Sequence, residues 1–554
     1  MFSFKCFVLL GVLCATVSPV LGQNWGIPSP KPRLVVQIVV SQMHPDHLAR
    51  HWNRFGDDGF KLLVNNGLNC SQVSYGHQHT QAYPNLASLA TGADPAVHGI
   101  VGNRWYARAQ SAEVHATADP KAQTVGGSFS QGQHSSKNLL CTTLSDQLRL
   151  ASPSSKVIGI AIDASSAILS TGHCATGAFW LDTERGRWIS SNRYGSELPP
   201  WVDTLNAKGL ALLYAQRDWR LLNPLSTYAI ADTIGLRAPA QVKRQADKLQ
   251  ALASGVVRAG QKSPSNLSAL IETPFGNSYT VDMAIATLLG EELGLDRYTD
   301  FLSITFGAHR NIGSKFGPNS VEMEDAYLRL DRDLAHLLRF IDQQVGLRNT
   351  LVVLTADHGT GSSTEWLRDA GIPSGSFSSL LATTLLNSYL GALHGKGSWV
   401  LHCRDLQVYL NHKLIEEKKL NLSDIRQQAA NFMLEFGGVA RSVPAQMLMG
   451  FAPDNAPLAP FQRSYNAQRS GDVLLGLNPG WVEEGTGMAS ANTSFQHHAR
   501  VPLVFCGWRV RHGILHNPID MLQIAPTLAR VLGIEHPNGA AALPVLDVVQ
   551  MLED

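Results

Sequence analysis

The chain has 554 residues, of which 44% are hydrophobic and 16% charged, with 48 Gly and 27 Pro. This composition excludes an intrinsically disordered chain and is typical of a folded, loop-rich protein with a large core. Lys and Arg number 45 and Asp and Glu 44, so no basic field exists to attract nucleic acid, and we expect no nucleic-acid partner.

The N-terminus has the pattern of a secretory signal peptide. Lys5 precedes an apolar run at 6–17, and the short residues Val20 and Gly22 precede Gln23. This predicts a Sec-type signal over 1–22, cleaved after Gly22, and an exported protein that is periplasmic, cell-surface or secreted. A membrane anchor is the competing interpretation, but the run is too short to span comfortably, and we expect no membrane span in the mature chain.

Five cysteines remain after removal of the signal, and none has the Cys-x-x-Cys spacing of a structural zinc site. The sequence leaves open whether one or two disulfides form, and because five is an odd number at least one thiol must be free. Cys506 lies in an apolar run and is expected to be buried and inert.

Five apolar runs predict buried core strands, at 34–40, 156–161, 300–306, 351–356 and 501–505. Helical patterns alternate with them. A helix between two parallel strands forms a βαβ unit, so the sequence predicts an α/β fold with a doubly wound, mostly parallel sheet.

One helix is especially clear, beginning at Ser320. Acidic residues occupy its first turn and apolar residues recur at helical spacing as far as Ile341. Its Asp325, Asp331 and Asp333 are expected to form a solvated or cap-pairing face and not a site.

Two long stretches, 178–295 and 365–479, lack the character of a core and are predicted insertions. The core α/β domain is then assembled from three parts, 23–177, 296–364 and 480–554.

The 351–356 strand delivers Asp357 and His358 to its C-terminal end, where ligands bind in open α/β sheets. Carboxylate and imidazole are good zinc ligands, but a metal needs three or four donors. A structural turn, with His358 bonded to backbone, is the equal alternative.

Ordered motifs along the chain give a specific resemblance. They include Thr91-Gly92, 95–103, 316–320, 355–359, 469–472 and Val501-Pro502-Leu503. With them the chain resembles the alkaline phosphatase superfamily, closest to the bacterial phosphate-irrepressible alkaline phosphatases and the nucleotide pyrophosphatase/phosphodiesterases. The resemblance implies the alkaline-phosphatase fold, with the two insertions as a cap over the site. It also implies two zinc ions and a threonine or serine nucleophile.

At most positions that the resemblance assigns to chemistry, this chain has another residue. Ser41 stands where a first aspartate ligand is expected, Arg310 and Ser314 where an aspartate and a histidine are expected, and Arg500 where the last histidine is expected. The nucleophile position is Ala82. Thr80 is two residues away, which displaces its hydroxyl by roughly 6 to 7 Å on an extended loop.

The segment 162–167, where a phosphate-binding lysine and arginine are expected, reads Asp163 and Ser165. Of the family's set only Asp357, His358 and the substrate-side Asn103 are retained, as vestigial residues. A misplaced alignment is the alternative for Arg310 and Arg500, since histidines lie close by at 309, 497 and 498.

Two guanidinium groups beside two zinc ions would be strongly repelled, and arginine does not lose its proton. We therefore expect Arg310 or Arg500 to pair with Asp357 in place of a metal centre. The same two arginines are candidate contacts for a small anionic ligand.

These observations favour an exported pseudoenzyme with no catalytic residue and no cofactor, whose role is binding or assembly with an anion or an unknown protein partner. The first alternative is a metal-dependent phosphomonoesterase or phosphodiesterase with a rebuilt, mononuclear zinc site formed by Asp357, His358, His309 and either His497 or His498. The second is a structural component of a cell-envelope complex.

Overall fold

The computed structural model describes residues 30–228, 267–450, 456–485, 487–488 and 492–553. The predicted signal peptide lies outside these residues. No helix in the described part of the chain is long and apolar enough to cross a bilayer.

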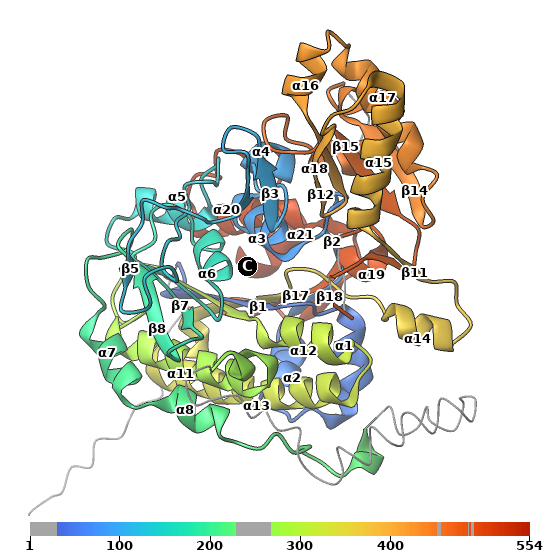
Figure 1. The fold of residues 1–554 in the computed structure, drawn as a ribbon. Helices are drawn as coiled ribbons and strands as arrows, with labels where there is room; N and C mark the ends of the chain where they lie inside the picture. Colours follow the sequence, from blue (N-terminus) through green and yellow to red (C-terminus); the bar gives the residue numbers. More distant parts are fainter. Residues whose placement is uncertain (1–29, 229–266, 451–455, 486, 489–491, 554) are drawn as a thin grey trace, which may run out of the picture.

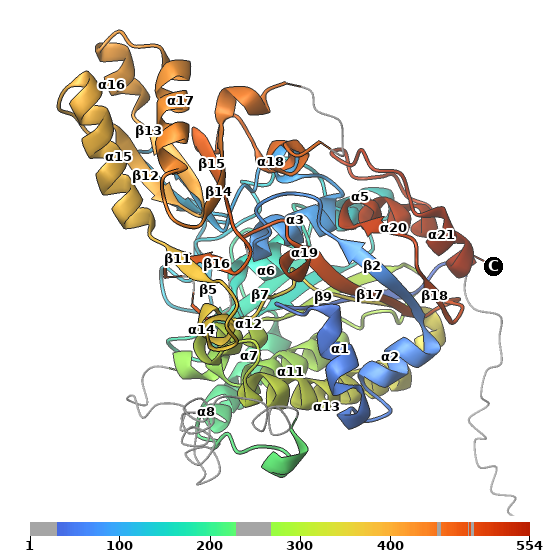
Figure 2. The ribbon, with the colours of Figure 1, turned by 90° about the vertical axis from the view of Figure 1, so that its right-hand side faces the viewer.

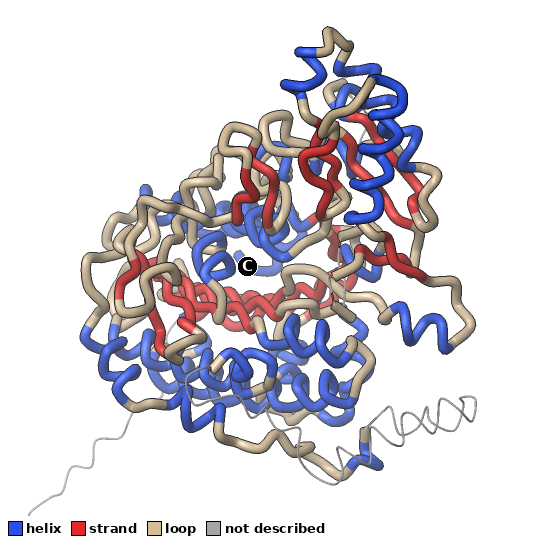
Figure 3. Tube along the Cα trace, in the orientation of Figure 1, coloured by secondary structure: helices blue, strands red, loops and turns tan. Residues whose placement is uncertain are grey.

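A central mixed sheet of 11 strands divides the molecule into two layers of helices (Figures 1 and 3). Its middle strands are parallel, and antiparallel strands flank them on both sides. In spatial order the strands are β18 (Gly513–Leu515), β2 (Leu68–Ser74), β17 (Arg500–Gly507), β10 (Thr350–Thr355), β1 (Leu34–Val40), β9 (Asp300–Phe306), β6 (Val157–Ala161), β7 (Gly177–Asp182), β8 (Arg187–Ser191) and β5 (Thr124–Val125), with β19 (Ile519–Asp520) also on β2.

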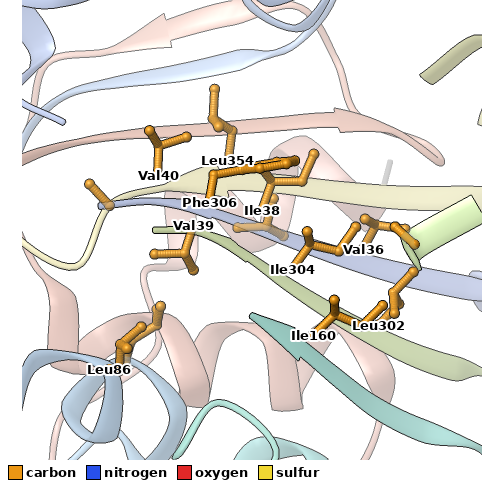
Figure 4. Close-up of a cluster of buried hydrophobic side chains, with 14 of the residues drawn as sticks. Val36, Ile38, Val39, Val40, Leu86, Ile160, Leu302, Ile304, Phe306 and Leu354 are labelled. Atoms are coloured by element: carbon orange, nitrogen blue, oxygen red, sulfur yellow. The ribbon is translucent and has the colours of Figure 1, made fainter. Parts of the chain in front are cut away.

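The five predicted core strands are all present, and the prediction of a mostly parallel α/β sheet is confirmed. Each of them is almost completely buried because helices cover both faces. Successive side chains alternate between the faces, so that Val39 points to Leu86 of the upper helical layer while Val40 points away from it (Figure 4).

The chain passes back and forth between the two helical layers, so each layer contains helices from more than one part of the sequence (Figure 1). The layer above the sheet contains α3 (Ala82–Thr91), α4 (Pro95–His98), α5 (Leu144–Ala151), α6 (Ala164–Leu169), α20 (Ile524–Leu532) and α21 (Leu546–Glu553). The layer below contains α1 (Pro45–His51), α2 (Phe60–Asn66), α7 (Pro200–Ala207), α8 (Leu210–Ala215), α11 (Phe275–Gly290), α12 (Ala308–Phe316) and α13 (Val321–Gln344).

Helix α13 begins as predicted, because the Ser320 side chain accepts a hydrogen bond from Met323 N at 3.1 Å. Its aspartates are not a solvated face. Asp325 accepts from Trp219 Nε1 and Tyr228 OH, and Asp331 accepts from Phe60 N at the start of α2. These two carboxylates are buried and join the helix to neighbouring segments.

The two predicted insertions differ in structure. Residues 178–295 add β7 and β8 to the main sheet and supply α11, which packs against α13. Residues 365–479 form most of a separate lobe above the sheet with a hydrophobic core of its own (Figures 1 and 2).

We call this lobe the cap. It is built on an antiparallel four-stranded sheet in the order β12-β13-β15-β14. Its elements are β11 (Gly375–Phe377), α15 (Ser379–His394), β12 (Val400–Arg404), β13 (Gln407–Leu410), α16 (His412–Glu417), α17 (Leu422–Met433), β14 (Val439–Pro444), α18 (Ala459–Ser464), β15 (Val473–Leu477) and β16 (Trp481–Glu483). Helix α14 (Thr364–Asp369) lies outside this lobe, at the side of the core (Figure 1).

The cap is fixed to the core through a hairpin of β3 (Arg104–Ala107) and β4 (Ala112–His115). Arg108, which follows β3, donates to Asp472 of the cap at 2.9 Å, and Arg426 and His412 bond the same carboxylate. These bonds lower the pKa of Asp472 despite its burial.

All five cysteines after the signal are free thiols, so the disulfides left open by the sequence do not form in this structure. Cys506 is buried, and burial raises the pKa of its thiol to about 11, which makes it unreactive as expected.

Candidate functional site

The site lies where β1, β9 and β10 end side by side. Val39 pairs with Thr305 on one side and with Thr355 on the other, so the loops after these strands meet at one edge of the sheet. Asp357 follows β10 and Ser41 follows β1, as the sequence predicted. Ligands of parallel sheets bind at such an edge.

Asp357 is fully buried and only half satisfied. Its Oδ1 accepts hydrogen bonds from Gln42 N and His358 N, each at 2.8 Å. Its Oδ2 has no hydrogen-bond partner in the described structure, and neither has the buried hydroxyl of Ser41. His358 Nδ1 bonds to the carbonyl oxygen of Gly359 at 2.6 Å, which is the backbone contact expected of a structural turn.

Arg310 does not pair with Asp357, and that prediction is wrong. Its Nη2 donates instead to Asp163 Oδ2 at 2.8 Å, and its guanidinium lies 5.7 Å from the ring centre of Tyr83. Burial alone would raise the pKa of Asp163, but Arg310 and the hydrogen bonds from Ser166 hold it below its ordinary value. Arg310 is on the first turn of α12, and from there its side chain reaches Asp163 at the start of α6.

Arg500 does not pair with Asp357 either. It begins β17 opposite Ser74 of β2, and its Nη2 donates to the carbonyl oxygen of Ser71 at 3.0 Å. Both arginines therefore have partners of their own, which is not the arrangement expected of two free contacts for an anion.

The N-terminus of α3 carries Ala82, the predicted nucleophile position, as its first residue. Asn103 Oδ1 accepts from Tyr83 N at 3.0 Å, while Gln81 Oε1 accepts from Asn103 N at 2.7 Å. The hydroxyl of Thr80 donates to the carbonyl oxygen of Thr493 at 2.6 Å. Thr80 is thus bonded within the fold and not directed at a substrate, and Asn103 serves as a cap of the helix.

Asn85, on the next turn of α3, holds this helix to the end of β10. Its Nδ2 donates to the carbonyl oxygen of Asp357 at 2.6 Å, and its Oδ1 lies 2.6 Å from His77 Nε2. Nothing in the sequence around His77 indicates the partner that its side chain meets eight residues later, so this contact was not predictable.

The residues near the predicted phosphate contacts form a neutral hydrogen-bonded network. Ser165 Oγ lies 2.6 Å from Thr117 Oγ1 and 3.4 Å from His115 Nδ1. Burial, with His134 alongside, lowers the pKa of His115 to about 4, so its ring is uncharged at neutral pH.

The histidines proposed for a mononuclear zinc site are not gathered around one point with Asp357 and His358 in the described structure, although Gly359 N donates to the carbonyl oxygen of His498 at 2.7 Å. His309 Nδ1 bonds to Asn277 of α11 at 3.0 Å, and its ring lies 4.5 Å from Tyr327 of α13. His498 Nδ1 bonds to Thr493 Oγ1 at 2.7 Å. Within the described ranges, no three His, Cys, Asp or Glu side chains are grouped as metal ligands.

Two carboxylates of the cap lie close to each other, and one of them contacts Gln81 at the start of α3. Asp405 bonds to the side chain of Gln81, and burial raises the pKa of Asp405 to about 6. Glu483 Oε2 accepts from Leu406 N at 3.2 Å, and burial together with Asp405 raises the pKa of Glu483 to about 7. Asp405 and Leu406 both have positive φ, at 53° and 58°, as the two-residue turn between β12 and β13 requires.

Comparison with known proteins places the chain in a family. The sequence model described as type I phosphodiesterase / nucleotide pyrophosphatase matches residues 35–499. The alkaline phosphatase PafA of Elizabethkingia meningoseptica is 34% identical over 556 residues, covering 98% of each chain. The alkaline phosphatase PhoV of Synechococcus elongatus is 34% identical over 524 residues, covering 94% of this chain and 93% of that protein. The chain belongs to the type I phosphodiesterase / nucleotide pyrophosphatase family.

The fold of this family member is of the alkaline-phosphatase type. The crystal structure of wild-type alkaline phosphatase PafA matches it with a TM-score of 0.85 at 32% identity, covering 94% of this chain and 99% of that one. The resemblance stated from the sequence motifs is therefore confirmed for both family and fold.

The family resemblance implies two zinc ions, and the side chains gathered at this site do not fit such a pair. Asp357 and His358 are the donors retained, while Ser41 is neutral and Arg310 is a permanent cation already paired with Asp163. Ser314 lies on α12, where its carbonyl oxygen accepts from Met488 N at 2.9 Å.

Proposed function

We propose that this protein is a non-hydrolytic member of the family, a pseudoenzyme that keeps the phosphatase architecture and acts by binding or assembly. One observation carries the proposal, the ion pair between Arg310 and Asp163. By the family resemblance, a cation occupies a metal-ligand position and a carboxylate occupies the segment that contacts phosphate. The charges of the site are inverted, which disfavours both a divalent cation and a phosphate.

Further support comes from the groups that would have to act in hydrolysis. Ala82 has no nucleophilic atom, and the Thr80 hydroxyl is bonded to a backbone oxygen at 2.6 Å. The donors at the start of α3 are partly used by Asn103. A phosphoryl group entering here would meet the carboxylates of Asp163 and Asp405, and the guanidinium of Arg310 is already paired with Asp163.

The pairing of Arg310 changes the ligand that we propose. The guanidinium is shared with Asp163, so a small anion is no longer the favoured occupant of the site. A neutral or positively charged group that donates hydrogen bonds would suit the unpaired Oδ2 of Asp357 better. Export through a signal peptide over residues 1–22 remains part of the proposal.

A metal-dependent phosphomonoesterase or phosphodiesterase is the second candidate, favoured by the relatives. Two proteins named alkaline phosphatases are each 34% identical over almost the whole chain. Asp357 and His358 supply two donors. A single zinc needs at least one more, which a rearranged loop would have to supply.

One experiment separates the two. The purified mature protein is equilibrated with excess zinc, freed of unbound metal, and assayed for metal content and for release of nitrophenol from a nitrophenyl phosphate monoester and diester. We expect less than one zinc in ten chains and no turnover above the H358A variant. One or more zinc per chain, with turnover that H358A abolishes, would establish the hydrolase instead.

A further inference from the structure

The longest helix of the cap presents an uncharged apolar face to solvent. Helix α15 has 16 residues without a single Asp, Glu, Lys or Arg. Its inner side packs into the core of the cap through Ala382, Leu386 and Leu390. On its outer side Leu380 is 80% exposed and Leu381 is 52% exposed. Figure 2 shows the helix along the outer edge of the upper lobe, with no other element of the chain beyond it.

The polar side chains on the outer face offer no hydrogen to a partner. The hydroxyl of Thr384 donates to the carbonyl oxygen of Leu380 at 3.0 Å, and that of Ser388 donates to the carbonyl oxygen of Thr384 at 3.0 Å. Hydroxyls bonded back to their own helix in this way have satisfied their donors. A partner that covers the outer face therefore leaves the hydroxyl donors of Thr384 and Ser388 satisfied, and this face can be buried as an apolar surface.

Large and small side chains are separated along this face. On the outer face the exposed leucines Leu380, Leu381 and Leu385 lie in the first half of the helix, whereas Ser388, Gly391 and Ala392 lie in the second. The exposed Leu393 follows Leu386 by seven residues and so lies on the inner side, at the end of the helix. Apart from the backbone of α15 itself, no atom of the described residues lies within 4 Å of the place that a Cβ would take at Gly391. Ridges of one helix pack into grooves of another, so small residues mark where a second helix can approach closely.

We infer that the outer face of α15 is a homodimer interface, in which the same helix of a second copy packs antiparallel across a two-fold axis. Antiparallel packing sets the leucine half of each helix over the small half of its partner. Leu381 then lies against the partner's Ala392, and Leu385 against the partner's Ser388. The face is complementary to itself, which is the requirement of an isologous two-fold contact.

Charge favours a second copy over an unrelated partner. A helix with no charged side chain meets its own copy without repulsion, and antiparallel packing places opposite ends of the two helix dipoles together. A stable interface buries roughly 800 Å² per partner, more than one helix face supplies. We therefore expect a weak dimer.

Sedimentation velocity of the full mature chain tests the dimer, over about 1 to 100 μM, the range in which a small interface associates. We expect a reversible shift from monomer to dimer, and at least a tenfold weaker association for L381E or L385E. The matched control is L150E, because Leu150 of α5 is 62% exposed and lies outside the cap. A monomer throughout the range, or a dimer that L381E and L385E leave unchanged, would overturn the inference.

Cysteine crosslinking tests the direction of packing. Chains carrying L381C mixed with chains carrying A392C should form a mixed disulfide, whereas neither variant should crosslink with itself above the wild-type background. Crosslinking of L381C alone would show parallel packing and refute the antiparallel interface. Near-unchanged unfolding midpoints of all variants would show that the fold is retained.

Discussion

Asp163 accepts two kinds of hydrogen bond at once, from Arg310 Nη2 at 2.8 Å and from Ser166 N at 3.0 Å. It is therefore both the N-cap of α6 and the partner of the one arginine on α12 at the site. The ion pair joins the helix layer above the sheet to the layer below it, across the ends of the parallel strands (Figure 1).

The first prediction is that D163N destabilises the protein by about 1–3 kcal/mol, because the amide keeps the cap of α6 but leaves Arg310 without a counter-charge. Urea unfolding at pH 7 measures it. D58N is the control, since Asp58 and Arg339 form an exposed pair and should change stability by less than about 0.5 kcal/mol.

The same carboxylate fixes the sign of a pH effect. Since the folded pKa of Asp163 is below its ordinary value, its stabilisation is present above the ordinary value and is lost as pH falls through the folded value. The difference in stability between wild type and D163N should shrink below about pH 3.5. An equal difference at pH 7 and pH 3 would contradict this account.

The second prediction concerns Glu483, whose buried carboxyl has a pKa raised to about 7 from 4.5. The folded state binds this proton more tightly than the unfolded state, so stability falls as pH rises from about 4.5 to 7. E483Q removes the loss and should raise stability at pH 8 by about 2 kcal/mol, with little effect at pH 4.5. Thermal unfolding of the cap at both values checks it, and an equal shift at both would argue against a proton on Glu483.

Much of the core was predictable from the sequence, for a physical reason. Strands buried on both faces are continuous apolar runs, and β1 and β9 begin and end where those runs predicted. The start of α13 followed from the cap at Ser320. These features depend on residues close together in the chain, so local patterns are enough to find them.

The partner of Arg310 was not predictable in this way. Asp163 and Asp357 are both aspartates at strand ends, 147 residues and 47 residues from it along the chain. The choice between them depends on where α12 directs the side chain once the sheet has formed. The carboxyl pair of Asp405 and Glu483 was missed for the same reason, because a strained turn of the cap brings Asp405 to Gln81.

The third prediction concerns the buried histidines beneath the sheet. Burial lowers the pKa of His309 to about 3, and burial with Arg54 alongside lowers that of His51 to about 3. The unfolded state binds these protons first, so the stabilisation is present above pH 6.5 and is lost as pH falls below it. H309F keeps an aromatic ring against Tyr327 and removes one such group.

The H309F variant should lose less stability than wild type between pH 7 and pH 5, by about 2 kcal/mol. Urea unfolding at pH 7 and pH 5 gives the loss of stability of each protein between the two pH values. H309F also leaves Asn277 without its acceptor, but this cost is the same at both pH values and cancels in that comparison. H336Q is the control, because His336 is exposed on α13. If H309F and wild type lose stability in parallel, His309 does not titrate in this way.

The fourth prediction uses Asp357 to separate a vestigial site from a working one. Its Oδ1 bonds to Gln42 N and His358 N, while its buried Oδ2 bonds to nothing in the described structure. Asparagine keeps the accepting oxygen and removes the charge, so D357N should be neutral or stabilising by about 1 kcal/mol in a protein without metal. A chelator should then leave the unfolding temperature of wild type and D357N unchanged.

A zinc-dependent member would behave in the opposite way. Bound zinc stabilises the folded state, so removing one zinc ligand weakens zinc binding and destabilises the protein. D357N and the chelator would each lower the unfolding temperature of such a protein, and their effects would not add. S41A supplies the matched control: Ser41 is equally buried and also has an unpaired oxygen, but it lacks the charge. If D357N stabilises more than S41A, the buried charge itself is unfavourable, as expected where no metal balances it.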